Sequence, residues 1–226
     1  MVSKKLIAFI LALSIISAVI PVFLSSCADA ALANAVRLKH EYTKDGVTGN
    51  FFDEANGRYY VYCGGYLRAA EINPKVYAVC PKEKGLAEVR LHEIPGLDPA
   101  KWLSENIEEI PIPLLFREQS EEEPTLAGFE TERIHITISD EATIALSVIE
   151  KQEEIDIIVN DYLNGEAVPV PYYIDSMTYN FESSKYKGIY YILQCIIDAK
   201  GKIYLYDSWT KRCVPCSEKP AQESTD

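Results

Sequence analysis

Cysteine spacing near the C-terminus is the feature of this sequence that points most directly to chemistry. Cys213 and Cys216 form a Cys-x-x-Cys motif, which can hold a reactive thiolate beside its resolving partner or supply half of a zinc site. A redox motif needs its first cysteine at a helix N-terminus, whereas Cys213 ends a strand pattern, and no comparable second pair completes a zinc site. The motif therefore predicts packing or an incidental disulfide, with a thiol oxidoreductase as a distant alternative.

Three histidines, His40, His92 and His135, are the only imidazoles that could act as general bases. His135 falls at the polar phase of a strand pattern and His92 lies in a charged run, so we expect ordinary surface or half-buried side chains. The sequence contains no G-x-S-x-G, phosphate-binding glycine loop, H-E-x-x-H or EF-hand motif. Catalytic residues thus stay unknown, neither a cofactor nor a metal site is indicated, and a binding role is favoured over catalysis.

The charge balance argues against polyanionic partners. The chain carries 22 basic and 34 acidic side chains, a net charge of −12, and Lys4 and Lys5 are the only charges before Cys27. Phosphate backbones and anionic headgroups would be repelled on average. We therefore expect no nucleic-acid partner and only weak electrostatic adhesion to membranes.

The first 26 residues predict an export signal, with a basic start, an uncharged apolar run over residues 6–24 and two small residues before Cys27. Leu24-Ser25-Ser26-Cys27 resembles the lipobox of bacterial lipoproteins, in which the cysteine thiol carries diacylglycerol. The resemblance covers residues 1–27 alone. It implies lipidation of Cys27 and a lipid-anchored position at the cell membrane, facing the extracytoplasmic side.

Two alternatives to the lipid anchor stay open. Ala28-Asp29-Ala30 fits the A-x-A pattern of ordinary signal cleavage, which would release a soluble protein. The apolar run is 19 residues long, close to the roughly 20 that span a bilayer, so it could also remain as an uncleaved anchor. Five cysteines follow Cys27, an odd number that cannot all pair within one chain.

The stretch from Asn50 to Ile94 alternates Tyr- and Val-rich runs with turn residues and predicts an antiparallel meander. Asn56-Gly57 is a typical hairpin turn pair. Asp98-Pro99 then predicts an N-cap and a short helix over residues 99–106, with Trp102 facing inward. The acidic residues 118–124 predict a solvated loop and a boundary between subdomains.

The second half predicts a strand, a helical segment and a further sheet. Residues 134–138 alternate as on a half-buried strand, and residues 140–164 indicate one helix or two. Its later part places Ile155, Ile158, Val159, Tyr162 and Leu163 on one helical face. Runs from residue 174 onward, separated by tight turns, predict an antiparallel meander.

The turns of this C-terminal meander predict its register. If Gly201 ends a three-residue loop in the left-handed conformation, Cys195 lies opposite Leu205 and Gln194 opposite Tyr206. If the next turn pairs Asp207 with Lys211, Cys213 also faces Leu205. One face is then a core of Leu193, Cys195, Ile197, Ile203, Leu205 and Cys213. Cys195 and Cys213 would lie two strands apart, about 9.5 Å, and should not be bonded to each other.

The opposite face of this meander gives the candidate binding surface. It would carry Ile192, Gln194, Ile196, Tyr204, Tyr206, Arg212 and Val214, with Trp209 in the adjoining turn. Tyr204, Tyr206, Trp209 and Arg212 could bind a sugar ring or a peptide, because aromatic side chains give contact area at low entropic cost. In the alternative, a helix or the first sheet covers this face.

The domain prediction is a signal peptide (1–26), a short linker (27–36), a β-rich subdomain with one short helix (37–120), an α+β subdomain ending in an antiparallel meander (121–216) and a polar tail (217–226). Residues 37–216 could instead be one domain. The predicted fold class is α+β, with antiparallel β meanders before and after a central helical segment.

The predicted function is a cell-surface lipoprotein that binds a ligand or acts as a structural or interaction module of the bacterial envelope. Its expected partners are the membrane, through the lipid anchor, and a glycan, peptide or envelope protein. The alternative is an exported hydrolase acting on envelope polymers.

Overall fold

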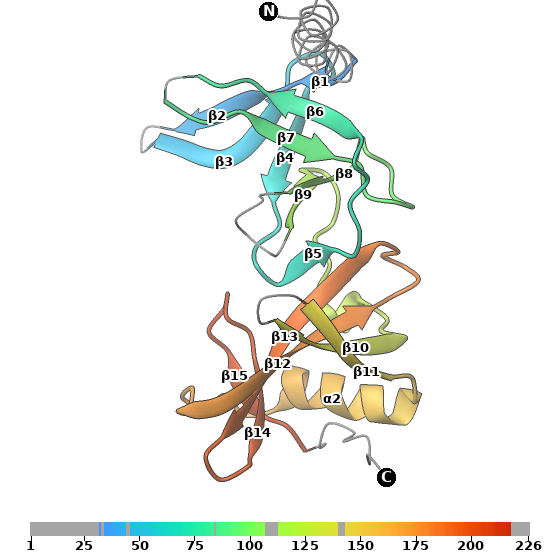
Figure 1. The fold of residues 1–226 in the computed structure, drawn as a ribbon, viewed down its shortest axis with the longest axis vertical. Helices are drawn as coiled ribbons and strands as arrows, with labels where there is room; N and C mark the ends of the chain where they lie inside the picture. Colours follow the sequence, from blue (N-terminus) through green and yellow to red (C-terminus); the bar gives the residue numbers. More distant parts are fainter. Residues whose placement is uncertain are drawn as a thin grey trace, which may run out of the picture.

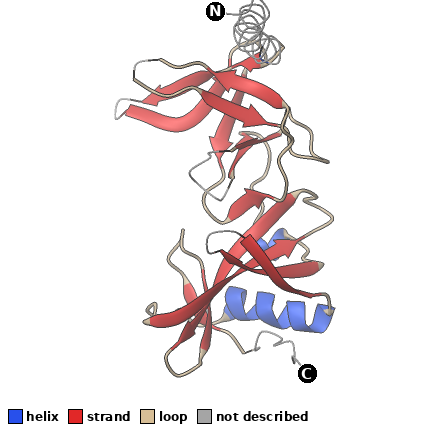
Figure 2. Cartoon of the chain, in the orientation of Figure 1, coloured by secondary structure: helices blue, strands red, loops and turns tan. Residues whose placement is uncertain are grey.

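The computed structural model describes residue 32 and residues 34–43, 46–83, 85–106, 113–139 and 143–217. The predicted export signal, the lipidation site Cys27 and the end of the polar tail lie outside these residues. Within them, no helix is long and apolar enough to cross a membrane. The fold is mostly β (Figure 2). Of the described residues, 47% lie in strands, and one α-helix is described. Antiparallel strands do lie before and after a helix, but the balance is more strongly β than the predicted α+β class.

The first sheet has eight strands in the order β1-β6-β7-β8-β9-β4-β3-β2 (Figure 1). Its strands are β1 (Val36–Arg37), β2 (Lys39–Thr43), β3 (Gly46–Asp53), β4 (Arg58–Tyr62), β6 (Val76–Cys80), β7 (Val89–His92), β8 (Trp102–Glu105) and β9 (Leu114–Glu118). Only Leu38 separates β1 from β2, so the two ends of the strand order meet and the sheet is a nearly closed barrel. Buried side chains such as Phe51, Tyr60 and Leu103 fill it.

The β3–β4 hairpin confirms the turn predicted at Asn56-Gly57. Asp53 pairs with Arg58, and Gly57 adopts a φ of 66°, which glycine takes without a Cβ clash. The buried carboxylate of Asp53 accepts hydrogen bonds from the backbone N–H groups of Ala55 (3.1 Å) and Asn56 (3.2 Å). The strands β6 and β7 likewise form an antiparallel pair.

The second sheet has seven strands, in the order β11-β10-β12-β13-β14-β15, with β5 also pairing β13. Its strands are β5 (Leu67–Ala69), β10 (Arg133–Ser139), β11 (Thr143–Ile149), β12 (Tyr173–Glu182), β13 (Ile189–Asp198), β14 (Ile203–Tyr206) and β15 (Cys213–Pro215). The helix α2 (Gln152–Asn164) and the 3-10 helix η1 (Leu126–Gly128) accompany it. Ile155, Ile158 and Tyr162 of α2 are buried and share a core cluster with Leu193 and Leu205 of the sheet.

Strand β5 links the two sheets. It lies in the first half of the chain, yet Leu67 pairs with Tyr191 and Arg68 with Tyr190. The core of the second sheet also takes in side chains from the first half, among them Cys63, Trp102 and Leu115. Along the chain, the last strand of the first sheet is β9 and the next strand, β10, belongs to the second sheet, so the predicted boundary at residues 120 and 121 falls between them. The division into two subdomains stays a prediction.

Two predicted helical segments are wrong. Residues 98–101 form a single turn, in which Asp98 accepts a hydrogen bond from the N–H of Ala100 (2.9 Å), and β8 then replaces the predicted helix over 99–106. Residues 102–104 are all buried between β7 and β9, and that packing outweighs the N-terminal signal. Residues 143–149 form β11, because Ile144, Val148 and Ile149 are β-branched and fit a strand better than a helix.

The predicted register of the C-terminal meander is correct for one hairpin and wrong for the next. Gly201 has a φ of 76°, and Gln194 pairs with Tyr206 and Cys195 with Leu205 as expected. In the following turn the N–H of Asp207 donates to the carbonyl of Arg212 (2.9 Å) instead of residue 211. Leu205 therefore pairs with Val214, and Cys213 moves to the face opposite Cys195.

Candidate functional site

The four residues predicted as a binding surface do not form one surface. Tyr204 and Tyr206 are half-buried on one face of β14, as expected. Trp209 is 55% exposed, and its ring packs edge-on against Tyr62 of the first sheet, 5.7 Å between centroids. The Arg212 guanidinium donates hydrogen bonds to three backbone carbonyls at the end of α2, those of residues 162 (3.2 Å), 163 (3.4 Å) and 165 (2.9 Å). Arg212 thus satisfies the C-terminal carbonyls of a helix.

A different set of side chains shares one face of the second sheet with Tyr206. Paired residues on neighbouring strands share a face, and the pairing joins Arg68 to Tyr190, Tyr190 to Glu182, Asn180 to His135, and Gln194 to Tyr206. We call this surface the polar face, made of Arg68, Arg133, His135, Asn180, Glu182, Tyr190, Gln194 and Tyr206. Helix α2 packs on the other side of the sheet, with Leu193 and Leu205.

Arg68 is the central cation of the polar face. Its Nη2 donates a hydrogen bond to Asn180 Oδ1, and its guanidinium lies 5.7 Å from the centroid of the Tyr190 ring. Burial lowers the pKa of Arg68, since the charged form is partly desolvated. Among the residues that the structure describes, no carboxylate forms an ion pair with Arg68. Its positive charge is therefore held in place without a counter-ion.

Asn180 holds the arginine in position. Its side chain is fully buried, and its Nδ2 donates to Thr137 Oγ1 (3.0 Å) and to the carbonyl of His135 (3.0 Å). With both amide protons used, Oδ1 is oriented toward Arg68. An amide in mid-strand whose two N–H groups and oxygen are all hydrogen-bonded is a rigid anchor for the guanidinium.

An imidazole and a carboxylate lie beside this cation. His135 Nε2 is 2.6 Å from Glu182 Oε2, and the His135 ring lies 5.6 Å from that of Tyr190. Burial raises the pKa of Tyr190, and the nearby charge of Glu182 adds to the rise. The carboxylate of Glu182 is thus engaged by His135, and Tyr190 stays a neutral phenol that can donate a hydrogen bond.

Three polar groups of this face have no hydrogen-bond partner among the described residues. They are the hydroxyls of Tyr190 and Tyr206 and the side-chain amide of Gln194, all on half-buried residues. These groups remain in contact with solvent, whereas both ring nitrogens of His40 are buried and have no hydrogen-bond partner in the described part of the chain. The polar face therefore presents one fixed cation without an ion pair to the described residues, Arg68, and three unused polar groups over the apolar floor of Ile192.

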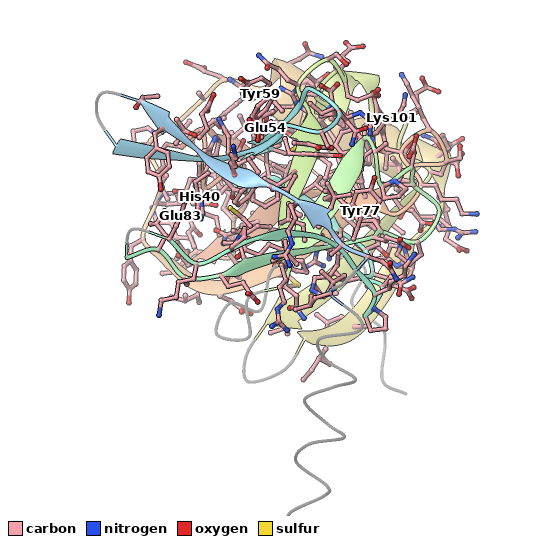
Figure 3. All side chains as sticks on the ribbon, turned by 90° about the horizontal axis from the view of Figure 1, so that it is seen from above. His40, Glu54, Tyr59, Tyr77, Glu83 and Lys101 are labelled. Carbon is pink, nitrogen blue, oxygen red and sulfur yellow. The ribbon has the colours of Figure 1, made fainter. Side chains whose placement is uncertain are left out.

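A separate hollow of about 520 Å³ lies at the rim of the barrel. Arg37, Lys39, Glu54 and Glu83 are among its lining residues, and in Figure 3 Glu54 and Glu83 are labelled on either side of the β1–β2 ribbon. Lys39 pairs with Glu54 at 2.5 Å. Because the opposite charges of this hollow are mixed and partly paired, they favour no particular class of ligand.

Cys63, Cys80, Cys195 and Cys213 are buried thiols, Cys216 is half-buried, and no disulfide joins these five described cysteines to one another. Burial raises the pKa of Cys213, the opposite of what a reactive Cys-x-x-Cys thiolate needs. Burial also raises the pKa of Cys63 to about 12 and that of Cys195 to about 11. Across the described ranges, no group of three or more His, Cys, Asp or Glu side chains could hold a metal ion.

No protein-family profile, no curated protein and no solved structure matches this chain. The function must therefore be argued from the polar face and from the sequence.

Sequence reasoning missed Arg68, Asn180 and Tyr190. Arg68 lies in a three-residue strand, and its partner β13 begins 120 residues later in the chain, so no local pattern joins them. Asn180 carried a usable signal, because a lone asparagine within the strand pattern of residues 174–181 is uncommon and calls for a buried hydrogen-bonding role.

Proposed function

We propose that this protein is a binding module of the bacterial envelope, anchored by a lipid on Cys27 and taking up its ligand on the polar face. The observation that supports the binding role best is Arg68, a half-buried cation held by Asn180 and Tyr190 without a counter-ion among the described residues. An uncompensated charge in a partly desolvated position costs stability. A ligand that placed a compensating group beside Arg68 would offset this loss of stability.

The composition of the polar face also fits binding. Tyr190 and Tyr206 supply flat contact area with few rotatable bonds, and their hydroxyls are available for hydrogen bonds. Such aromatic residues, with arginine, are enriched at recognition surfaces. The candidate ligands are the glycans, peptides and proteins of the envelope.

The arrangement of the two sheets suits an anchored protein. In Figure 1, the barrel with β1 lies at one end of the long axis, and the second sheet, with β14 near its tip, lies at the other. A lipid on Cys27 would hold the chain on the β1 side, because only nine residues separate Cys27 from Arg37. The barrel would then act as a spacer that carries the polar face away from the membrane surface.

Photo-crosslinking in living cells of the source bacterium tests the binding role. Replacing Tyr206 by p-benzoylphenylalanine places a photoreactive group on the polar face, and the same replacement at Tyr172, which is 84% exposed, is the matched control. We expect a covalent adduct of defined mass from position 206 and not from position 172. Equal adducts from both positions, or none from position 206, would contradict the proposal.

A further inference from the structure

We infer that the polar face recognises a ligand through a single carboxylate group, bound by the guanidinium of Arg68. This inference rests on the proposed binding function and names the chemical class of its ligand. The ligand would carry one carboxylate at one end and a short polar body that reaches Gln194 and Tyr206.

The guanidinium has the geometry for this task. Arginine offers five N–H donors in a planar fork that matches the two oxygens of a carboxylate. Asn180 uses Nη2 of Arg68 for one hydrogen bond, and no other described residue accepts a hydrogen bond from the guanidinium. The remaining donors can therefore reach a carboxylate, while Asn180 and the Tyr190 ring fix the orientation of the fork.

The charges around Arg68 favour one negative charge over two. Two arginines lie on the part of the face around Tyr190. Arg133, which pairs with Glu182 in the strand register, forms ion pairs with Glu150 (3.3 Å) and Glu182 (3.9 Å), whereas Arg68 forms none with the described residues. Glu182 and Glu71 both act on the Tyr190 phenol. A phosphate dianion would meet these two carboxylates with only one arginine, Arg68, that is not already in an ion pair, and the chain as a whole carries a net charge of −12. A monovalent carboxylate neutralises Arg68 without adding an uncompensated charge.

The spacing along β13 sets the size of the ligand. Tyr190, Ile192 and Gln194 follow one another on the same face, so Tyr190 and Gln194 lie about 13 Å apart at the usual rise of a strand. Ile192 is nearly buried between them and gives an apolar floor. With its carboxylate bound at Arg68, a ligand of two or three sugar rings or amino acids would extend over Ile192. Its polar groups would then reach Gln194 and Tyr206.

Paired acid and neutral probes test this inference on the full-length protein in detergent. One pair is a galactose trisaccharide that ends in a single galacturonic acid against the all-galactose trisaccharide, and the other is N-acetyl-trialanine against its C-terminal amide. Titration calorimetry should show that the acid of at least one pair binds ten-fold or more tightly than its neutral counterpart. The pair that responds distinguishes a sugar acid from a peptide C-terminus as the source of the carboxylate.

Variants then assign the preference to Arg68. Arg68→Gln should abolish the preference for the acid, and Arg68→Lys, which keeps the charge but loses the fork, should weaken acid binding several-fold. Arg90→Gln is the control, because Arg90 lies on β7 of the barrel and pairs with Glu88 at 2.8 Å. Circular dichroism verifies that each variant is folded.

The inference is wrong if neither acid binds more tightly than its neutral partner, or if folded Arg68→Gln keeps the preference. Either result can coincide with a crosslinked adduct at position 206, in which case the face binds a ligand by other chemistry and the binding function stands. Loss of both the adduct and the acid preference would remove the proposed function as well.

Discussion

Arg68 and Asn180 are 112 residues apart in the chain, and Arg68 Nη2 donates a hydrogen bond to Asn180 Oδ1 across strand β13. This contact joins the first half of the chain to the second sheet, because Arg68 belongs to β5 and Asn180 to β12. It also fixes Arg68, the cation of the polar face that has no ion pair to the described residues. The contact thus links the way the two halves of the chain associate to the proposed binding role.

Replacing Asn180 by alanine should both destabilise the protein and weaken ligand binding. The substitution leaves Arg68, Thr137 and the carbonyl of His135 without the partner they now have. Leaving buried polar groups unsatisfied costs about 1–3 kcal/mol. Urea unfolding measures the loss. A variant as stable as the wild type would show that Asn180 does not hold these groups.

Replacing His40 should have the opposite effect on stability. His40 is 8% exposed, and neither ring nitrogen has a hydrogen-bond partner among the described residues, while its ring centroid lies 5.5 Å from that of Phe51. His40→Leu removes the unsatisfied groups and should raise the free energy of unfolding by about 1 kcal/mol. His92→Leu is the control, because His92 Nδ1 has a partner in the carbonyl of Asn73 (3.1 Å). Equal shifts in both variants would contradict this explanation.

Stability should fall in alkaline solution because of the buried thiols. Burial raises the pKa of Cys63 to about 12 and those of Cys80 and Cys195 to about 11, from an ordinary value of 9.0. Above pH 9 the unfolded chain loses these protons and the folded chain keeps them, so the contribution is full below pH 9 and is lost as the pH rises toward 11.

Each such thiol lowers the free energy of unfolding by about 1.4 kcal/mol per pH unit in that window. Urea unfolding at pH 8, 9 and 10 measures the slope, and Cys80→Ala should make it shallower. A free energy of unfolding that is constant from pH 8 to pH 10 would mean that the thiols are not protected.

The sequence was sufficient where structure depends on local signals. Turn residues located the hairpin at Gly57 and the left-handed position at Gly201, and apolar spacing identified the buried face of α2. Prediction from the sequence failed where tertiary packing determines the structure. In β8, burial between two strands outweighs the helix-start signal of Asp98-Pro99. Only part of the polar face could be predicted. The positions of Gln194 and Tyr206 follow from the hairpin register, but Arg68 joins the face through a long-range pairing of β5 with β13 that no local pattern indicates.

Replacing Cys27 by serine should release the proposed anchor. The acyl chains of a lipoprotein bury CH₂ groups at about 0.8 kcal/mol each, and two or more chains hold a protein at the membrane where one does not. The serine variant should either accumulate as a precursor tethered by its apolar signal or be cut after Ala30 and enter the medium. Wild type should gain the mass of a diacylglyceryl group and begin at residue 27. An unmodified chain beginning at Ala31, or one retaining Met1, would contradict the lipid anchor.

Native mass spectrometry of the protein extracted from its own membranes tests the binding role of Arg68 most directly. The wild type should carry a carboxylate-containing ligand at one copy per chain, and the folded Arg68→Gln variant, extracted in the same way, should lack it. A wild type that carries no ligand, or a variant that carries the same ligand at the same occupancy, would contradict the account.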